Sequence, residues 1–374
     1  MSMRWKGGFI QTWFDPLTPG STAYNLWSWG QNSSGQLGLG NLSNYSSPKQ
    51  VGALTNWSSV SCGSNYTVSI KTDGTLWSWG YNFYGQLGLN NTTYYSSPKQ
   101  VGALTNWSSV ACGVNHTVSI KTDGTLWSWG YNNAGQLGLG NRTNYSSPKQ
   151  VGALTNWSSV SCGQYYTVSI KTDGTLWSWG RNQYGQLGLG NITYYSSPKQ
   201  VGALTNWLSV SCGLYHTVSI KTDGTLWSWG QNSNGVLGLN NVTYYSSPKQ
   251  VGALTTWSSV SCGDYHTVSI KTDGTLWSWG KNNIGQLGLG NTTNYSSPKQ
   301  VGALTNWLSV SCGAYHTVSI KTDGTLWSWG FNTYGQLGLG NITNYSSPKQ
   351  VGALTFWTKL FKGAATGSTI AISS

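Results

Sequence analysis

The chain has 374 residues and a formal net charge of +12, yet only 7% of its residues are charged, far below the usual fraction of about a quarter. All eight acidic residues are Asp, and the absence of Glu together with few Ala and Met excludes amphipathic helices of ordinary strength. With 50 Gly and 23 Trp, the composition is typical of a folded β protein with many turns. No run approaches the ~20 apolar residues that cross a bilayer, so we expect no membrane insertion.

Residues 1–22 stand outside the repeated part of the chain. They carry Trp5, Phe9, Trp13 and Phe14, so they are too apolar for a free tail. They are also too short for a domain. We expect this arm either to dock onto the rest of the chain or to anchor the protein to another subunit. It lacks the unbroken apolar stretch of a secretory signal, so we expect synthesis in the cytoplasm without a signal peptide.

The remainder of the chain repeats with a period of 50 residues. The motif LWSWG begins at seven equivalent positions, from Leu26 and Leu76 to Leu326, and SSPKQVGALT follows it in every unit. Within one unit, apolar and polar residues alternate over 59–62 and again over 66–72, which is typical of β-strands.

Turn and breaker residues indicate how the strands of a unit connect. The Asp73-Gly74 pair predicts a hairpin with a type I′ turn that joins 66–72 to 75–80. Pro98 within SSPKQV fits only an edge strand, because proline has no N–H for a central ladder. Each unit therefore has four antiparallel strands with the last one outermost. We expect the tryptophans to pack between neighbouring units, as represented by Trp57, Trp77 and Trp79.

The two ends of the repeat region complement each other. Residues 357–363 and 369–372 match a first and a second strand, whereas 24–30 and 47–51 match a third and a fourth. The ends thus complete one blade between them, which favours a closed ring over an open array. We predict an all-β, seven-bladed β-propeller of four-stranded blades. The predicted domains are an arm at 1–22 and one propeller at 23–374, with six complete blades at about 55–354 and the seventh from 355–374 plus 23–54.

Two motifs carry a resemblance to a known family. The segment from Gly80 to Gly88, Gly-x-Asn-x-x-Gly-Gln-Leu-Gly, and that from Cys112 to Thr117, Cys-Gly-x-x-His-Thr, resemble the regulator of chromosome condensation repeat over 24–373. The resemblance implies a seven-bladed propeller, and members include a nucleotide exchange factor for the GTPase Ran and a bacterial β-lactamase inhibitor. The exchange factor works through a protruding insertion and acidic residues. Uniform 50-residue units without Glu make guanine nucleotide exchange the less favoured expectation.

Cysteine and histidine recur at fixed positions. Six Cys occupy one position per unit, with Lys362 at the seventh, and no CxxC pair exists. We expect buried, inert thiols, with a ring of metal ligands or of disulfides as the alternatives. Four His share their position with Tyr66 and Tyr166, and a phenol does not replace an imidazole in metal ligation or base catalysis. These are His116, His216, His266 and His316.

The chain offers little chemistry for catalysis or for nucleic acid. Six of the eight Asp are hairpin residues equivalent to Asp73, which leaves Asp15 and Asp264. The Walker, GxSxG and HExxH motifs are missing from the sequence. We expect no enzyme activity, no cofactor and no metal site. Thirteen of the twenty basic residues are equivalents of Lys49 and Lys71 spread around the ring, so nucleic acid is not an expected partner.

The residues that differ between otherwise similar units fall into three groups. They lie after the LWSWG strand, after the Cys-Gly pair and within the long connection to the SSPKQV strand. In a four-stranded meander the first-to-second and third-to-fourth connections emerge at the same end, so all three groups map to one face. Loop drift after recent duplication is the alternative origin of these differences. We predict a binding face that contains Tyr81, Phe83, Tyr84, Tyr131, Arg142, Arg181, Tyr184, Asp264, Lys281, Phe331 and Tyr334.

Two functions are compatible with these features. The Thr-, Ser-, Asn-, Gly- and Trp-rich composition and the near-identical repeats are similar to those of surface proteins of bacteria and tailed bacteriophages. The first hypothesis is a non-enzymatic virion or cell-surface protein. Residues 1–22 would anchor it to a protein partner, and the variable loops would face a glycan, a receptor or a neighbouring protein. The second is an intracellular scaffold or inhibitor that binds one protein partner through the same loops.

Overall fold

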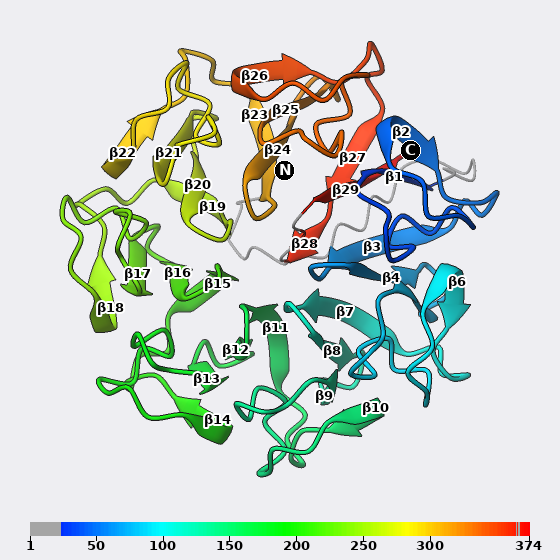
Figure 1. Ribbon diagram of the computed structural model, residues 1–374. Helices are drawn as coiled ribbons and strands as arrows, with labels where there is room; N and C mark the ends of the chain where they lie inside the picture. The colour runs from blue at the N-terminus through cyan, green and yellow to red at the C-terminus, as the bar shows by residue number, and fades with distance from the viewer. Residues whose placement is uncertain (1–23, 364, 366) are drawn as a thin grey trace, which may run out of the picture.

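The computed structural model describes residues 24–363, 365 and 367–374. These residues form seven sheets arranged around a central axis (Figure 1). The predicted all-β, seven-bladed propeller is thus confirmed. Within the described ranges there is no helix with the length and apolarity that a membrane crossing requires. The arm predicted at 1–22, with its four aromatic anchor residues, lies outside the described residues.

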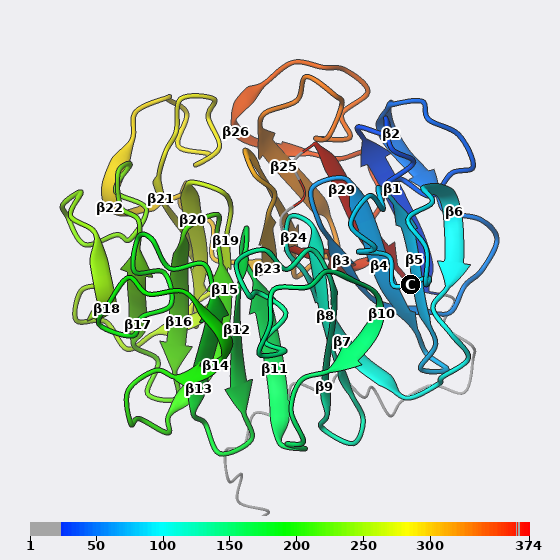
Figure 2. The same cartoon turned by 60° about the horizontal axis from the view of Figure 1, so that its bottom comes forward.

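Six complete blades each contain four antiparallel strands in chain order, with the first nearest the axis and the fourth on the outer wall (Figures 1 and 2). The strands are β3 (Trp57–Cys62), β4 (Tyr66–Lys71), β5 (Leu76–Gly80) and β6 (Tyr95–Gln100); β7 (Trp107–Cys112), β8 (His116–Lys121), β9 (Leu126–Gly130) and β10 (Tyr145–Gln150); β11 (Trp157–Cys162), β12 (Tyr166–Lys171), β13 (Leu176–Gly180) and β14 (Tyr195–Gln200); β15 (Trp207–Cys212), β16 (His216–Lys221), β17 (Leu226–Gly230) and β18 (Tyr245–Gln250); β19 (Trp257–Cys262), β20 (His266–Lys271), β21 (Leu276–Gly280) and β22 (Tyr295–Gln300); and β23 (Trp307–Cys312), β24 (His316–Lys321), β25 (Leu326–Gly330) and β26 (Tyr345–Gln350).

The seventh blade joins the two ends of the described chain, as predicted. Its strand order is β2–β1–β29–β27, and β1 pairs antiparallel with β29 along its whole length. A short strand, β28, follows β27 and pairs in parallel with β3 of the next blade. The bounds are β1 (Asn25–Gly30), β2 (Tyr45–Gln50), β27 (Trp357–Leu360), β28 (Lys362–Gly363) and β29 (Ser368–Ser373).

The hairpin turn between the second and third strands differs from the prediction. A type I′ turn needs positive φ at both central residues, whereas Gly74 alone in this turn has it, at 76°. The Asp73 carboxylate accepts hydrogen bonds from the backbone and the hydroxyl of Thr75, at 2.9 and 2.7 Å. The predicted turn type is therefore wrong, because these side-chain bonds stabilise a turn that ends in a left-handed glycine.

Tryptophans fill the space between blades, as expected. Trp107 and the fully buried Trp129 form one apolar cluster with Val68 and Leu76 of the preceding blade. The Trp107 ring meets Trp127 and Trp129 edge to face, with ring centroids 6.3 and 6.0 Å apart. Such aromatic pairs contribute ~0.5–1.5 kcal/mol each beyond the area that they bury.

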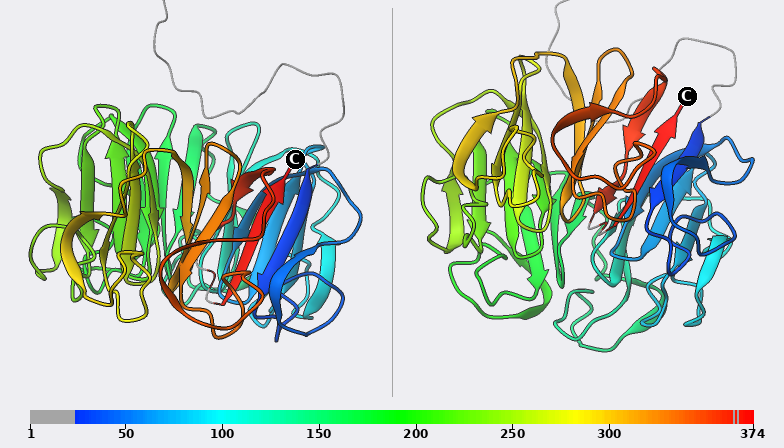
Figure 3. Two further views of the ribbon diagram at one scale, coloured as in Figure 1. Left: turned by 90° about the horizontal axis from the view of Figure 1, so that it is seen from above. Right: turned by 45° about the horizontal axis from the view of Figure 1, so that its top comes forward.

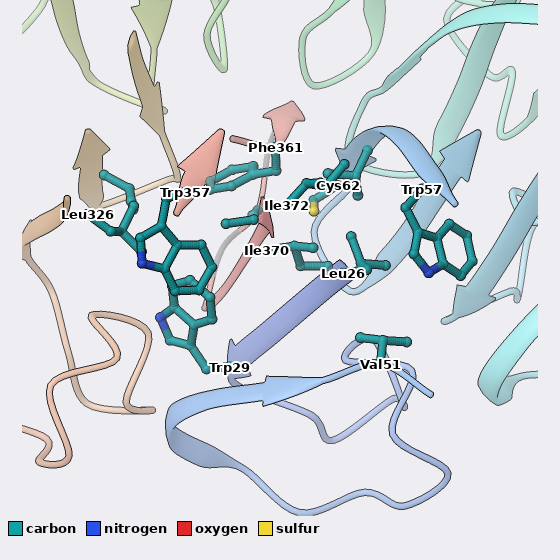
Figure 4. Packing of buried hydrophobic residues seen from close by; sticks show 14 of the residues in the cluster. Leu26, Trp29, Val51, Trp57, Cys62, Leu326, Trp357, Phe361, Ile370 and Ile372 are labelled. Carbon is teal, nitrogen blue, oxygen red and sulfur yellow. The ribbon is translucent and has the colours of Figure 1, made fainter. Parts of the chain in front are cut away.

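The closing blade has an equivalent core built from both ends of the chain. Ile370 and Ile372 of β29 pack with Leu26 of β1, and Trp29 meets Trp357 edge to face at 6.0 Å (Figure 4). These contacts join strands that are far apart in the sequence. The ring is therefore closed by side-chain packing as well as by the β1–β29 ladder.

One backbone carbonyl per blade joins that blade to the next. The Gln86 carbonyl accepts hydrogen bonds from the Trp129 indole at 2.9 Å and from the Thr117 hydroxyl at 2.8 Å. Asn82 shapes the loop that presents this carbonyl, because its side-chain oxygen accepts the Leu87 N–H. The same two bonds occur at all seven junctions, with acceptors Gln36, Gln86, Gln136, Gln186, Val236, Gln286 and Gln336.

The Cys-Gly-x-x-His-Thr motif places a ring against a glycine. A Cβ on Gly113 would lie 2.2 Å from the His116 ring, so no larger residue fits there. His116 Nε2 lies 3.1 Å from the Thr167 hydroxyl, which donates its own proton to Gln136 O, so Nε2 is the protonated nitrogen. Burial lowers the pKa of His116 to about 3. At the equivalent position, the Tyr66 hydroxyl donates to the His116 carbonyl. Both ring types are therefore inter-blade contacts.

Serine side chains connect the innermost strands. The Cys112 N–H donates to Ser61 Oγ at 2.9 Å, and three later cysteines repeat this bond. At Cys162 the neighbouring residue is Ala111, which has no hydroxyl to accept it. All six cysteines are free and buried, as expected, and burial raises the pKa of the thiols.

The substitution Ala111→Ser should stabilise the protein. It supplies the acceptor that the other units already have, and the expected gain is about 1 kcal/mol in the free energy of unfolding. The matched variant Ser161→Ala removes the partner of the Cys212 N–H and should cost about 1–2 kcal/mol. Urea unfolding of both variants measures these changes, and a neutral Ala111→Ser would contradict the assigned hydrogen bond.

The four buried histidines predict loss of stability in mild acid. Their folded pKa of about 3 lies below the ordinary value of 6.5, so stability is full above pH 6.5 and falls as the pH drops toward 3. Replacing His216 by the tyrosine that other units carry should flatten this slope by about 1.4 kcal/mol per pH unit. Urea unfolding between pH 4 and pH 8 tests it, and an unchanged slope would mean that His216 is protonated in the folded state.

Candidate functional site

The two ends of the propeller carry different loops. The first-to-second and third-to-fourth connections, such as 63–65 and 81–94, lie at one end, which we call the variable face. The Asp-Gly turns and the VGALT connections, such as 72–75 and 51–56, lie at the other, which we call the turn face. The C-terminus lies at the turn face, opposite the long loops that join β1 to β2 and β25 to β26 (Figure 3).

Backbone hydrogen bonds hold the first-to-second loops in a ring around the axis. Gln164 N donates to Leu214 O, Leu214 N to Asp264 O, and Asp264 N to Ala314 O, at 3.2–3.4 Å. The side chains at this position differ in every complete unit, although the backbone N–H donates such a bond in five of the six. The variable residues are thus presented from a fixed support.

Four tyrosines follow this ring in consecutive blades. Arg181 lies over the rings of Tyr165 and Tyr215, with its guanidinium carbon 5.7 and 5.2 Å from the centroids. Lys281 lies in the same way over Tyr265 and Tyr315, with its ammonium 5.3 and 5.7 Å away. Each cation is thus placed between two aromatic rings from adjacent blades, an arrangement that attracts the cation to the ring faces.

Aromatic contacts extend both groups. Tyr131 meets Tyr84 at 4.5 Å and Tyr165 at 5.3 Å, and Phe83 packs on Tyr84 at 5.0 Å. This first run consists of Tyr81, Phe83, Tyr84, Tyr94, Tyr131, Tyr165, Arg181, Tyr215, Tyr184 and Tyr244. The second run consists of Tyr265, Lys281, Tyr315, Phe331 and Tyr334.

Nine of the eleven residues predicted from the sequence belong to these two runs. Of the other two, Arg142 is exposed on its own loop, and Asp264 lies beside the second run. Sequence reasoning missed the four tyrosines of the inner ring, Tyr165, Tyr215, Tyr265 and Tyr315. A signal for them existed, because Asn65 and Asn115 occupy the same position in the first two complete units.

Hydrogen bonds fix the orientation of Arg181. Its guanidinium donates to Gln164 Oε1 at 3.1 Å and to Gln183 Oε1 at 2.8 Å, and the Tyr194 hydroxyl also donates to Gln183. The partners come from both kinds of variable loop. Arg181 is therefore held in place before any ligand arrives, which lowers the entropy cost of binding.

Asp264 is the one carboxylate on the variable face among the described residues. Burial raises its pKa to about 7, although the nearby Lys281 opposes the shift. Asp264 in turn contributes to the raised pKa of Tyr265 and Tyr315, behind the effect of their burial. A carboxyl group with a pKa near neutral thus lies beside the second run.

Most other positive charge is not displayed on this face. The ammonium of Lys121 lies 3.8 Å from the ring centroid of Trp127 and 4.9 Å from that of Trp107. Burial lowers the pKa of Lys121, with Asp123 opposing the shift, and five equivalent lysines repeat this arrangement. The Lys49 equivalents are exposed on the outer strands, as Lys149 shows.

The described part of the chain holds no group of three or more His, Cys, Asp or Glu side chains placed to bind a metal ion. The imidazoles are used between blades, and the thiols are buried with raised pKa. What the variable face offers is therefore aromatic surface, amides and two oriented cations. These groups suit binding.

Replacing Asp264 should change how stability depends on pH. Because the folded pKa of about 7 exceeds the ordinary 3.8, the wild-type protein loses stability as the pH rises from 4 to 7. Asp264→Asn removes this loss. The free energy of unfolding of the variant, relative to that of the wild type, should therefore rise over that range by at most about 4 kcal/mol. Asp273→Asn, at a turn where hydrogen bonds to Thr275 lower the pKa, is the control and should show no such gain. Urea unfolding at several pH values gives the difference in the free energy of unfolding between variant and wild type. This difference would not change with pH if Asp264 were ordinarily solvated.

Comparison with known proteins places this geometry in a family. The family model of the RCC1-like domain matches residues 21–261. A model of the regulator of chromosome condensation (RCC1) repeat matches residues 273–320 and 323–369, and another model of the same repeat matches 257–286 and 307–336. None of the curated proteins compared with the chain matches it.

Solved structures share the fold at low sequence identity. Human WBSCR16 has a TM-score of 0.84 and 21% identity, with 94% of this chain and 99% of that chain covered. Prp20p from Saccharomyces cerevisiae has a TM-score of 0.84 and 20% identity, covering 95% and 92%. Yeast RCC1 (Prp20) with Kap60 bound gives 0.84 and 20%, covering 94% and 89%. Both the repeat motifs and the seven-bladed ring agree with the matched models, and the chain belongs to the RCC1-like domain family.

Proposed function

We propose that this protein is a non-enzymatic binding scaffold that holds a protein partner against its variable face. One observation carries the proposal. Units that are otherwise nearly identical differ at positions that come together in two runs of stacked aromatic and cationic side chains. Cations placed between tyrosines of adjacent blades favour a binding role over loop drift.

The chemistry of the face favours a protein over a small substrate. Tyrosine and arginine are enriched among the residues that dominate protein–protein binding energy, because they offer large, rigid and partly polar surfaces. Ser, Gly and Asn around such anchors supply adaptable hydrogen bonds, as in antibody loops. Prp20p is described by its binding to Gsp1p and histones and by its complex with Kap60, so one protein of this fold binds other proteins. We infer the same class of partner here, with a glycan as the alternative.

The buried groups support a role without catalysis. The histidines are neutral and hydrogen-bonded between blades, and six carboxylates are used in hairpin turns. The remaining described Asp, Asp264, lies on the variable face, away from the six at the hairpin turns, whereas a paired-carboxylate hydrolase needs two acids close together. Placement on a virion or cell surface is a further part of the proposal and rests on composition.

Affinity capture tests the proposal. A tagged full-length chain is incubated with cytosol and with purified particles of the source organism, and the bound proteins are identified by mass spectrometry. The double variant Arg181→Ala with Tyr215→Ala should weaken binding of the recovered partner at least about tenfold, because both side chains lie at the centre of the first run. Lys199→Ala, on the outer strand β14 of the same blade, is the matched control and should bind like the wild type.

Two outcomes would contradict the proposal. If binding were lost in Lys199→Ala but kept in the double variant, the interface would lie on the outer wall and not on the variable face. Turnover of a small substrate by the wild-type protein would exclude a purely binding role. A glycan array probed with the same variants separates a carbohydrate ligand from a protein partner, and recovery from particles but not cytosol would support the surface placement.

A further inference from the structure

The turn face carries a ring of exposed leucines. One leucine in each VGALT connection is 44–49% exposed, and all seven units have it, unlike the residues of the variable face. Together these leucines give the turn face a repeated apolar surface that is available to a partner segment. The seven are Leu54, Leu104, Leu154, Leu204, Leu254, Leu304 and Leu354.

One of these leucines, Leu154, lines a hollow at a blade junction. This hollow of about 380 Å³ is lined by Leu139, Val151, Leu154, Trp157, Trp177 and Pro198, among others. Two indole rings and a proline ring thus contribute to its wall. The junction between the closing blade and the next one has the same residues, namely Leu39, Val51, Leu54, Trp57, Trp77 and Pro98.

The first described residue lies beside this second junction. Tyr24 N donates to Thr55 O at 2.7 Å, and Trp57 N donates to Tyr24 O at 3.3 Å. In complete units the acceptor of the second bond is the glycine of the Asp-Gly turn, as in Trp107 N to Gly74 O. Tyr24 therefore occupies the place of a turn-face hairpin.

The Tyr24 side chain already contacts the junction. It packs against the apolar cluster that contains Val51 and Trp57. The ammonium of Lys359 lies 5.4 Å from the centroid of its ring. Tyr24 N is bonded to Thr55, the residue that follows Leu54. The chain that precedes Tyr24 therefore starts at the edge of the leucine ring.

We propose that residues 1–23 dock along the turn face of their own propeller, with the aromatic side chains of Trp5, Phe9, Trp13 and Phe14 against the ring of leucines. The occupant and the surface match in chemistry, since both are aromatic and aliphatic with few charges. A segment of this length reaches up to ~80 Å when extended, whereas packed sheets lie ~10 Å apart, so it can pass several junctions. The covalent link adds a high effective concentration. This inference concerns the face opposite the proposed partner site and is independent of it.

Thiol labelling tests the docking directly. Because the six native cysteines are buried, Thr12→Cys introduces one reactive thiol between Phe9 and Trp13. Its alkylation by iodoacetamide in the full-length protein is compared with that in a peptide of residues 1–22 carrying the same change. We expect the thiol in the protein to react at least about tenfold more slowly, with a rate that does not depend on protein concentration.

The repeats supply a matched control. Leu54→Ser with Leu104→Ser alters the junctions nearest Tyr24, whereas Leu204→Ser with Leu254→Ser alters identical positions across the ring. All four leucines are 46–49% exposed, so both pairs are expected to fold like the wild type, which thermal unfolding verifies. The near pair should restore labelling toward the peptide rate, and the distant pair should leave it slow.

Other outcomes overturn the proposal. If the Thr12→Cys protein with all leucines unchanged were labelled at the peptide rate, the arm would not dock on the turn face. Equal effects of the near and distant pairs would exclude the junctions beside Tyr24 as the site. Protection that disappears on dilution would place the arm on a second copy of the chain instead of on its own propeller.

Discussion

The propeller depends on a hydrogen-bond acceptor that lies outside its strands. Within a blade, the backbone ladder satisfies the sheet, but neighbouring blades are separate sheets except where β28 meets β3. The carbonyl at Gln86 and its equivalents supplies a connection at all seven junctions by accepting hydrogen bonds from a Trp indole and a Thr hydroxyl of the next blade. Since the acceptor is a main-chain atom, Val236 serves as well as glutamine.

The same loop that joins two blades also carries variable residues. Tyr84 precedes the acceptor by two positions, and its N–H donates to the Gln86 side chain. The variable side chains are thus mounted on segments that cannot shift without breaking an inter-blade contact. This explains how the surface can change from unit to unit while the ring stays the same, and it gives the face the preorganisation on which affinity depends.

The repeat period and the alternation of apolar residues were enough to predict the strands, the shared blade and the face on which the variable loops lie, because these follow from local geometry. The type of the hairpin turn was not predictable from Asp73-Gly74 alone, since side-chain bonds to Thr75 decide it. The cations between tyrosines required positions from adjacent blades to be compared in space. The burial of Lys121 between Trp107 and Trp127 depends in the same way on tertiary contacts that spacing does not reveal.

The shared blade has a consequence for biosynthesis. Trp27 of β1 is hydrogen-bonded to Ser373 of β29, a residue 346 positions later. At ribosomal rates of about 5–20 residues per second, β1 therefore waits roughly 20–70 s for the strand that covers its inner edge. During this time a strand with buried Leu26 and Trp29 has an unpaired edge, which is the geometry that promotes strand-to-strand aggregation. The yield of folded protein should thus depend on how quickly the last blade is translated.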